Sequence, residues 1–267
     1  MIVWQGVALF IAGMLAGALN SVAGGGSFIS FPTLLLVGVP AVPANATNAA
    51  AVLPGSIASI PPYRRDLAHE KREVLVFSLV SALGGVAGAL LLARTPQTLF
   101  ERMIPFLLFL ATIIFAAGGR ITTLFRRLSG RSKHTQDDQP RGNRGGAFVA
   151  VLAIQFVIAL YGGFFGGGIG IMMLAGFALL GLTDIHAMNA LKVVLASVIN
   201  GVAVVAFIVL RLIYWPQMIV MAVGAIVGGW AGARLAHEVP QNGIRWFVIT
   251  VGVGLSIYYF IHYLVLK

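Results

Sequence analysis

The sequence contains no cysteine and few charged residues. The absence of cysteine excludes disulfides, thiolate chemistry and cysteine-ligated metal or iron–sulfur sites. Only 10% of the 267 residues are charged, whereas a soluble domain carries about 25%. A Gly-Lys-Ser/Thr phosphate loop and a His-Glu-x-x-His zinc motif are also missing, and the histidines have no metal-ligand spacing. The sequence therefore predicts neither a built-in ATPase nor a zinc intramembrane protease, and no cofactor.

Hydrophobic sequence takes the place of these groups. Hydrophobic residues make up 59% of the chain, and the mean hydropathy is +0.95. No charged residue precedes Arg64, and the N-terminus lacks the basic region of a signal peptide, so we interpret it as a retained first span. Much of the net charge of +10 lies in one hydrophilic segment, which the positive-inside rule assigns to the cytoplasm. These features predict a polytopic helical protein of a cytoplasmic membrane, with the lipid bilayer rather than nucleic acid as its partner.

Two glycine triplets, Gly24-Gly25-Gly26 and Gly166-Gly167-Gly168, interrupt this hydrophobic sequence. Each glycine costs roughly 1 kcal/mol in a helix interior, and it leaves backbone uncovered in hydrocarbon. A long apolar run precedes each triplet and a short one follows it: 3–22 and 28–39 at the first, 147–165 and 169–182 at the second. The short runs do not reach across a bilayer of about 30 Å at 1.5 Å per residue. We therefore expect a break and a half-helix at each triplet.

The remaining apolar runs complete two similar halves. We expect helices at about 44–60, 74–93 and 103–125, and again at 187–210, 216–234 and 245–264, with Pro54-Gly55 interrupting the first of these. Residues 1–125 then form a first transmembrane repeat, 126–146 a basic cytoplasmic linker, and 147–267 a second transmembrane repeat. The expected fold is all-α, with two pseudo-symmetric repeats of four spanning helices plus one glycine-broken half-helix each, or 8–10 membrane helices.

Matches at a constant offset indicate that the halves are duplicated. Asn45-Ala46 recurs 144 residues later as Asn189-Ala190, and Gly84-Gly85 recurs as Gly228-Gly229, while the glycine triplets lie 142 apart. Re-entrant short pieces would make the repeats parallel, and crossing ones would make them inverted. Internal repeats with broken hydrophobic segments at matching positions are typical of secondary transporters.

Polar groups cluster beside the two breaks, and Lys192 stands out because it lies within an apolar run. A buried ammonium requires a partner, which an anionic substrate could supply. Exposed N–H groups and helix N-termini at the breaks also attract anions. Alternatively, Lys192 snorkels to an interface, and the Asn and Ser side chains only bridge helices. The candidate substrate-binding residues are Asn20, Ser21, Gly24, Gly25, Gly26, Ser27, Asn45 and Asn48 at the first break, and Gly166, Gly167, Gly168, Asn189, Lys192 and Asn200 at the second.

The order of these motifs resembles the sulfite exporter TauE/SafE family of permeases. The resemblance rests on Ala12-Gly13 through the Gly-Gly-Gly-Ser segment to Pro32, then Pro43 to Asn48, and on Asn189-x-x-Lys192 with Gly228-x-x-x-Gly232 in the second half. It implies two four-helix-like repeats and the export or import of small anions, mainly organosulfur compounds such as sulfite, sulfoacetate and sulfolactate. The first half departs from the second by having Asn48 at the position of Lys192.

These observations favour a secondary transporter that moves a small organic or sulfur-containing anion by alternating access, as the two repeats move against each other. The second hypothesis is an anion channel with the same glycine-lined filter. A membrane enzyme or a structural subunit is a third class, and the lack of paired intramembrane acids argues against the enzyme. The substrate, the direction, a coupling ion (proton or sodium) and a homo-oligomeric state stay open at this point.

Overall fold

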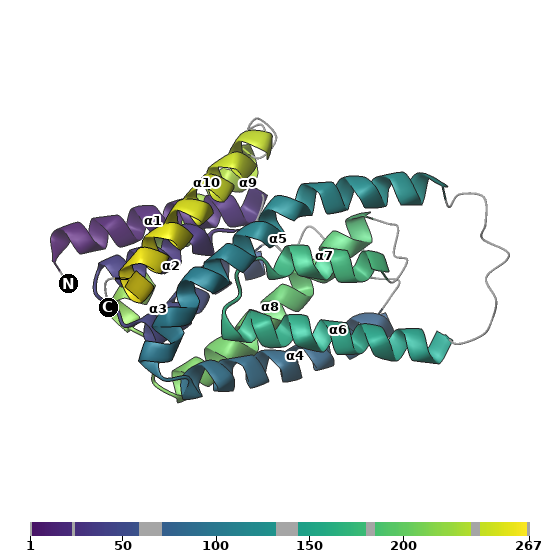
Figure 1. Ribbon diagram of the computed structural model, residues 1–267, viewed down its shortest axis with the longest axis horizontal. Helices are drawn as coiled ribbons and strands as arrows, with labels where there is room; N and C mark the ends of the chain where they lie inside the picture. Colours follow the sequence, from purple (N-terminus) through teal and green to yellow (C-terminus); the bar gives the residue numbers. More distant parts are fainter. Residues whose placement is uncertain are drawn as a thin grey trace.

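The computed structural model describes residues 2–22, 25–58, 71–131, 144–179, 185–235 and 241–265, and within these ranges the chain is helical with no strand. The first half contains α1 (Val3–Val22), α2 (Ser27–Leu36), α3 (Ala41–Ala58), α4 (Lys71–Arg94) and α5 (Gln97–Arg131). The second contains α6 (Arg144–Phe164), α7 (Ile169–Leu179), α8 (Ile185–Val209), α9 (Trp215–Leu235), α10 (Gln241–Phe260) and the π-helical turn η3 (Ile261–Val265) (Figure 1). The prediction of an all-α fold is confirmed, and Gly25-Gly26 and Gly166-Gly167-Gly168 lie between helices.

Two helices differ from the sequence-based expectation. α3 continues through Pro54-Gly55, where we expected an interruption. It packs against both α8 and α9, and such neighbours stabilise a helix across a proline. α5 continues to Arg131, six residues into the predicted linker, because Arg and Leu are good helix formers. The remainder of that linker lies outside the described residues.

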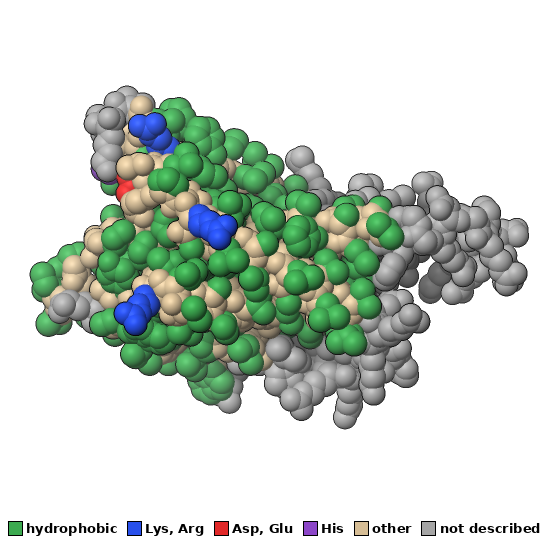
Figure 2. Space-filling view, turned by 90° about the horizontal axis from the view of Figure 1, so that it is seen from below, with side chains coloured by type: hydrophobic (Ala, Val, Ile, Leu, Met, Phe, Trp, Pro, Cys, Tyr) green, Lys and Arg blue, Asp and Glu red, His purple; other side chains and the backbone are tan. Residues whose placement is uncertain are grey.

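Six helices in the described part of the chain are long and apolar enough to cross a membrane, which makes this a multi-pass membrane protein: α1, α4, α5, α8, α9 and α10. We expected eight. α3 falls short because Asn45, Thr47 and Asn48 make it more polar, and the side chains that the structure describes in α6 begin only at Val149. Figure 2 shows a face covered mostly by hydrophobic side chains, with isolated Lys and Arg residues, as lipid contact requires.

The two halves follow one plan. The starts of α3, α4 and α5 at Ala41, Lys71 and Gln97 are each followed 144 residues later by the starts of α8, α9 and α10 at Ile185, Trp215 and Gln241. α2 and α7 begin 142 residues apart, which is the offset of the glycine triplets. The helix boundaries thus support the predicted duplication.

The halves interleave rather than standing side by side. α1 packs most extensively on α9, and its counterpart α6 packs on α4, which is the counterpart of α9. One bundle consists of α1, α2, α3 and α9, and the other of α6, α7, α8 and α4; Figure 1 shows the same division. α3 and α8 meet between the bundles, and α5 and α10 pack on each other and bridge them.

Glycine allows the closest of these contacts. The backbone of α1 at Gly13 lies directly on the Met221 carbonyl of α9, where a Cβ atom would clash. Gly88 of α4 has the same relation to the Leu160 carbonyl of α6. These contacts explain how two polar backbones approach each other without side chains between them.

Candidate functional site

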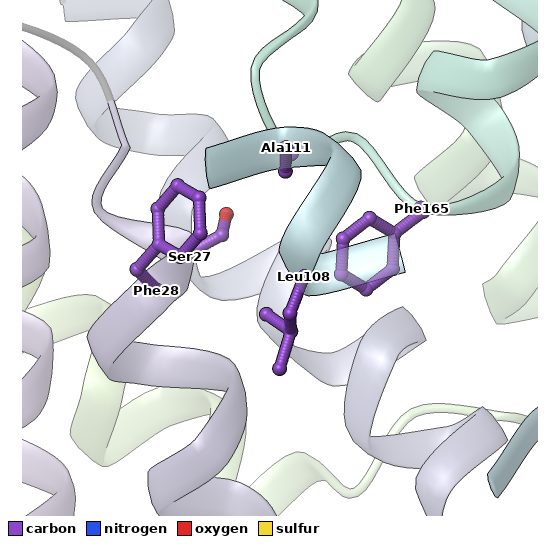
Figure 3. A pocket seen from close by; sticks show the side chains of 6 residues that line it. Ser27, Phe28, Leu108, Ala111 and Phe165 are labelled. Carbon is purple, nitrogen blue, oxygen red and sulfur yellow. The ribbon is translucent and has the colours of Figure 1, made fainter. Parts of the chain in front are cut away.

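A small cavity lies between the two glycine breaks. Ser27 and Phe28, in the first turn of α2, form one wall, and Phe165 and Gly167 of the second break form another. Leu108 and Ala111 of α5 complete the lining, and Figure 3 shows these α5 side chains between the α2 residues and Phe165. Its free volume is about 10 Å³, room for about one water molecule. The structure thus brings residues from both breaks to one place, although 140 residues separate Ser27 from Gly167 in the sequence.

The first break is held by an asparagine side chain. The Oδ1 atom of Asn20, near the end of α1, accepts a hydrogen bond of 2.8 Å from the N–H of Gly26. Gly25 has a φ of +91°, a conformation that only glycine adopts readily. Asn20 therefore acts as a cap for α2, and its side-chain oxygen is committed to the protein. Gly24 and the Ser21 side chain, also predicted here, lie outside the described residues.

Asn48 of α3 lies over the first turn of α2 and joins two serines. Its Nδ2 atom donates to Ser27 Oγ at 3.2 Å, and its Oδ1 atom accepts from the Ser30 hydroxyl. The Ser30 oxygen is also 3.1 Å from the Gly26 carbonyl oxygen, a second acceptor. Asn48 is 2% exposed and Ser30 is fully buried, so this is an internal polar network. Such networks are costly unless every member has a partner, and here Asn48 has one on each side.

The second break is more open. The N–H groups of Phe165 and Gly166 donate to the carbonyl of Tyr161, which lies in the last turn of α6. The next donors in the chain belong to Gly167, Gly168 and Ile169, and within the described part of the molecule these N–H groups donate to no acceptor. They precede the first turn of α7, where the helix dipole adds positive potential. Donors and dipole together suit an anion.

Lys192 of α8 lies over the first turn of α7, as Asn48 lies over that of α2. A Cβ atom at Gly170 would be 3.3 Å from Lys192 Cδ, so the lysine side chain runs along α7 where glycine leaves room for it. The first turn of α7 has Ile169 and Met172 where α2 has the two serines that bind Asn48. The second half therefore replaces a neutral amide network with a positive charge beside open N–H groups.

Two other predicted residues make contacts within the protein. Asn45 Nδ2 donates to the Phe164 carbonyl at 2.8 Å, so it joins α3 to the end of α6 at the second break. Asn200 Nδ2 donates to the Ala196 carbonyl of its own helix at 2.9 Å, which gives it no visible link to the cavity. Asn189 lies in α8, but its side chain is outside the described residues.

The apolar lining of the cavity has no signature in the sequence. Phe28, Leu108, Ala111 and Phe165 have no property that separates them from other apolar residues of a membrane protein, so no sequence signal identified them. The buried hydroxyl of Tyr161 has no hydrogen-bond partner in the described part of the chain, and its ring is 6.3 Å from that of Phe165. Among the described side chains there is no group of three His, Cys, Asp or Glu residues that could hold a metal ion.

Comparison with known proteins identifies similar membrane proteins. The family model for the sulfite exporter TauE/SafE matches residues 9–259. The chain is 28% identical to a probable membrane transporter protein, ORF9, of Sinorhizobium sp., over 93% of this chain and 90% of that protein. It is 29% identical to a probable membrane transporter protein of Haemophilus influenzae, over 93% and 91%, and 27% identical to probable membrane transporter protein YfcA of Escherichia coli K12, over 93% and 87%. No solved structure matches the chain significantly.

Proposed function

The chain is a multi-pass membrane transporter that belongs to the sulfite exporter TauE/SafE family, and from this premise we propose that it is a secondary carrier for a small organic or sulfur-containing anion. Sulfite, sulfoacetate and related sulfonates are the proposed cargo. The observation that carries the proposal is the cavity between the two breaks, which a hydroxyl of one half and the backbone of the other half both line.

The donors around this cavity suit an oxyanion. Ser27 contributes a hydroxyl. The N–H group of Gly167, which lines the cavity, has no protein acceptor in the described part of the chain, and neither has that of the neighbouring Gly168. Sulfite and sulfonate groups present three oxygen atoms, so several donors from different directions can bind them at once. Phe28 and Phe165 cover the cavity with apolar surface, and a low local dielectric strengthens each of these hydrogen bonds.

Lys192 supplies the charge that selects an anion over a neutral solute. Its side chain passes Gly170, three residues after the cavity-lining Gly167. In the proposed complex, the ammonium group and the N-terminus of α7 both contribute positive electrostatic potential at the anion. In this proposal Lys192 attracts the anion by its charge, and the backbone N–H groups orient the anion by hydrogen bonds.

The size of the cavity favours a small cargo. Its free volume is about 10 Å³, room for about one water molecule. Binding of sulfite or a two-carbon sulfonate therefore requires the lining side chains, such as Phe28 and Phe165, to move apart. A large amphipathic anion would have to displace these aromatic side chains altogether.

Alternating access then requires two bodies that move around the cavity. α1 packs on α9, and α4 packs on α6, so each body combines helices from both halves of the sequence. The proposed motion is therefore between the two interleaved bundles rather than between the two repeats, which is a change from the motion expected from the sequence. The cavity lies where the bundles meet, with Ser27 in one and Gly167 beside the other.

Calorimetric binding of sulfoacetate and sulfite to the purified protein tests this proposal. Lys192→Ala should weaken binding by roughly 30-fold or more, because removing one member of a desolvated charge pair costs about 2–5 kcal/mol. Lys192→Arg, which keeps the charge, is the matched control and should lose less. Equal affinities of Lys192→Ala and the wild type would contradict the anion site.

Flux through proteoliposomes separates a carrier from a channel. A carrier should show counterflow, in which unlabelled anion inside accelerates uptake of labelled anion, and it should saturate. Flux that ignores the internal anion and stays linear with concentration would favour a channel with the same glycine-lined filter.

A further inference from the structure

Asn48 is too deeply buried to contact a cargo freely, yet it touches a residue that lines the cavity. It is 2% exposed, and both polar atoms of its amide are hydrogen-bonded within the protein. One of its partners is Ser27, whose side chain lines the cavity between the two breaks. Any effect of Asn48 on the anion must therefore pass through Ser27.

The direction of these hydrogen bonds decides what Ser27 can do. Ser30 is a donor, because both atoms near its hydroxyl, Asn48 Oδ1 and the Gly26 carbonyl oxygen, are acceptors. With its Oδ1 atom facing Ser30, Asn48 presents Nδ2 to Ser27, and Ser27 Oγ accepts. A serine hydroxyl has one hydrogen and two acceptor lone pairs, so a serine that accepts from Asn48 keeps its own hydrogen for another partner.

We infer that Asn48 is a positioning residue that aims the Ser27 hydroxyl hydrogen into the cavity as a donor to the transported anion. This inference rests on the proposed function of the cavity. Ser30 fixes the orientation of the Asn48 amide, and Asn48 prevents Ser27 from donating back to it. The first half thereby contributes one oriented neutral donor to the site. Its counterpart at the matching position of the second half, Lys192, contributes the charge.

A double-mutant cycle on sulfoacetate binding tests the inference, with isothermal titration calorimetry of the purified full-length protein. Ser27→Ala should weaken binding by roughly 10-fold or more, the value of one hydrogen bond to a charged acceptor. Asn48→Ala should weaken it by a similar factor. The double variant Ser27→Ala/Asn48→Ala should bind no more weakly than either single variant, because both changes remove the same hydrogen bond to the anion.

Ser30→Ala provides a second variant in case the loss of Asn48 prevents folding. It removes only the group that orients the amide, so it should weaken binding less than Ser27→Ala and should have no further effect in a Ser27→Ala background. A general structural role of this cluster would instead lower affinity by the same factor whether or not Ser27 is present. Additive losses in either cycle, or wild-type affinity in Asn48→Ala, would overturn the inference.

The outcomes also separate this inference from the proposed function. Wild-type protein that binds neither sulfoacetate nor sulfite would overturn the anion site, and the role of Asn48 with it. Wild-type binding that depends on Lys192 but not on Ser27 would retain the anion site and overturn only the role of Asn48.

Discussion

The two glycine breaks occupy matching places in the fold but differ in the side chains that surround them and in the hydrogen bonds that their backbone makes. At the first, side chains hold the backbone: Asn20 accepts from Gly26, and Asn48 joins Ser27 to Ser30. At the second, the backbone donors after Gly166 have no protein acceptor within the described chain, and a lysine lies over α7. One break is closed by neutral hydrogen bonds, and the other has positive potential and open donors.

The residues that follow each break account for this difference. α2 begins with Ser27 and Phe28, whereas α7 begins with Ile169 and Gly170. The serine offers a partner to a short amide, and the glycine leaves space for a long lysine side chain. The two halves thus share their order of helices, while a few residues give the second break a different electrostatic character. Three further predictions test whether the two halves share the same helix packing and how their two breaks differ.

The largest effect should come from the shared frame. Gly84→Val and Gly228→Val change matching glycines whose Cβ atoms would meet the backbone of α6 and α1. Since backbone cannot move aside as a side chain can, we expect each variant to lose about 3 kcal/mol of stability or more. Thermal unfolding of purified protein measures this loss.

Gly254→Val is the control for this pair, because a Cβ at Gly254 meets no atom within 4 Å, so its stability should stay near that of the wild type. A severe loss in only one of the two matching variants would show that the halves do not share the same packing frame.

A smaller effect should come from the cap of the first break. Asn20→Ala leaves the Gly26 N–H without its acceptor, and an unsatisfied buried donor costs about 1–3 kcal/mol. Asn200→Ala is the matched control, since its amide binds only a carbonyl of its own helix, which the helix already pairs. Urea or thermal unfolding should show a clear loss for the first variant and little for the second. Equal stabilities would mean that the first break does not depend on its side chains.

The smallest effect should be the difference in stability between alanine variants at the two breaks, which reports how closely each break is packed. Gly25 and Gly168 both have positive φ, so alanine at either costs about 1–2 kcal/mol. A Cβ at Gly25 would also lie 3.2 Å from Phe115, whereas the nearest atom to one at Gly168 is 3.5 Å away. Gly25→Ala should therefore be the less stable variant in thermal unfolding. The reverse order would contradict the conclusion that the second break is the more open one.

The sequence predicts the helices and breaks well because they depend on local composition. The run 3–22 is helix α1 at the same bounds, and each triplet separates a long helix from a short one. The count of spanning helices and the end of α5 are less well predicted, because hydropathy does not reveal where a polar helix such as α3 is sheltered by its neighbours.

The contacts of the site residues depend on tertiary placement, which the sequence pattern does not contain. Polarity within an apolar run was enough to select Asn48 and Lys192, but not to predict that each lies over the first turn of a short helix. Asn200 has the same sequence signal, yet among the residues that the structure describes its amide binds a carbonyl of its own helix. The family match supports the transporter class, and the assignment of residues to the anion stays a prediction.

The interleaving of the halves has a consequence for biosynthesis. More than 190 residues separate the end of α1 from the start of α9, on which α1 packs most extensively. At a translation rate of roughly 5–20 residues per second, on the order of 10–40 s pass between the synthesis of α1 and the synthesis of α9. During that time its bare glycine surface at Gly13 and Gly17 is exposed to lipid or to the insertion machinery. The N-terminal half therefore completes its tertiary structure only after the C-terminal half has been synthesised.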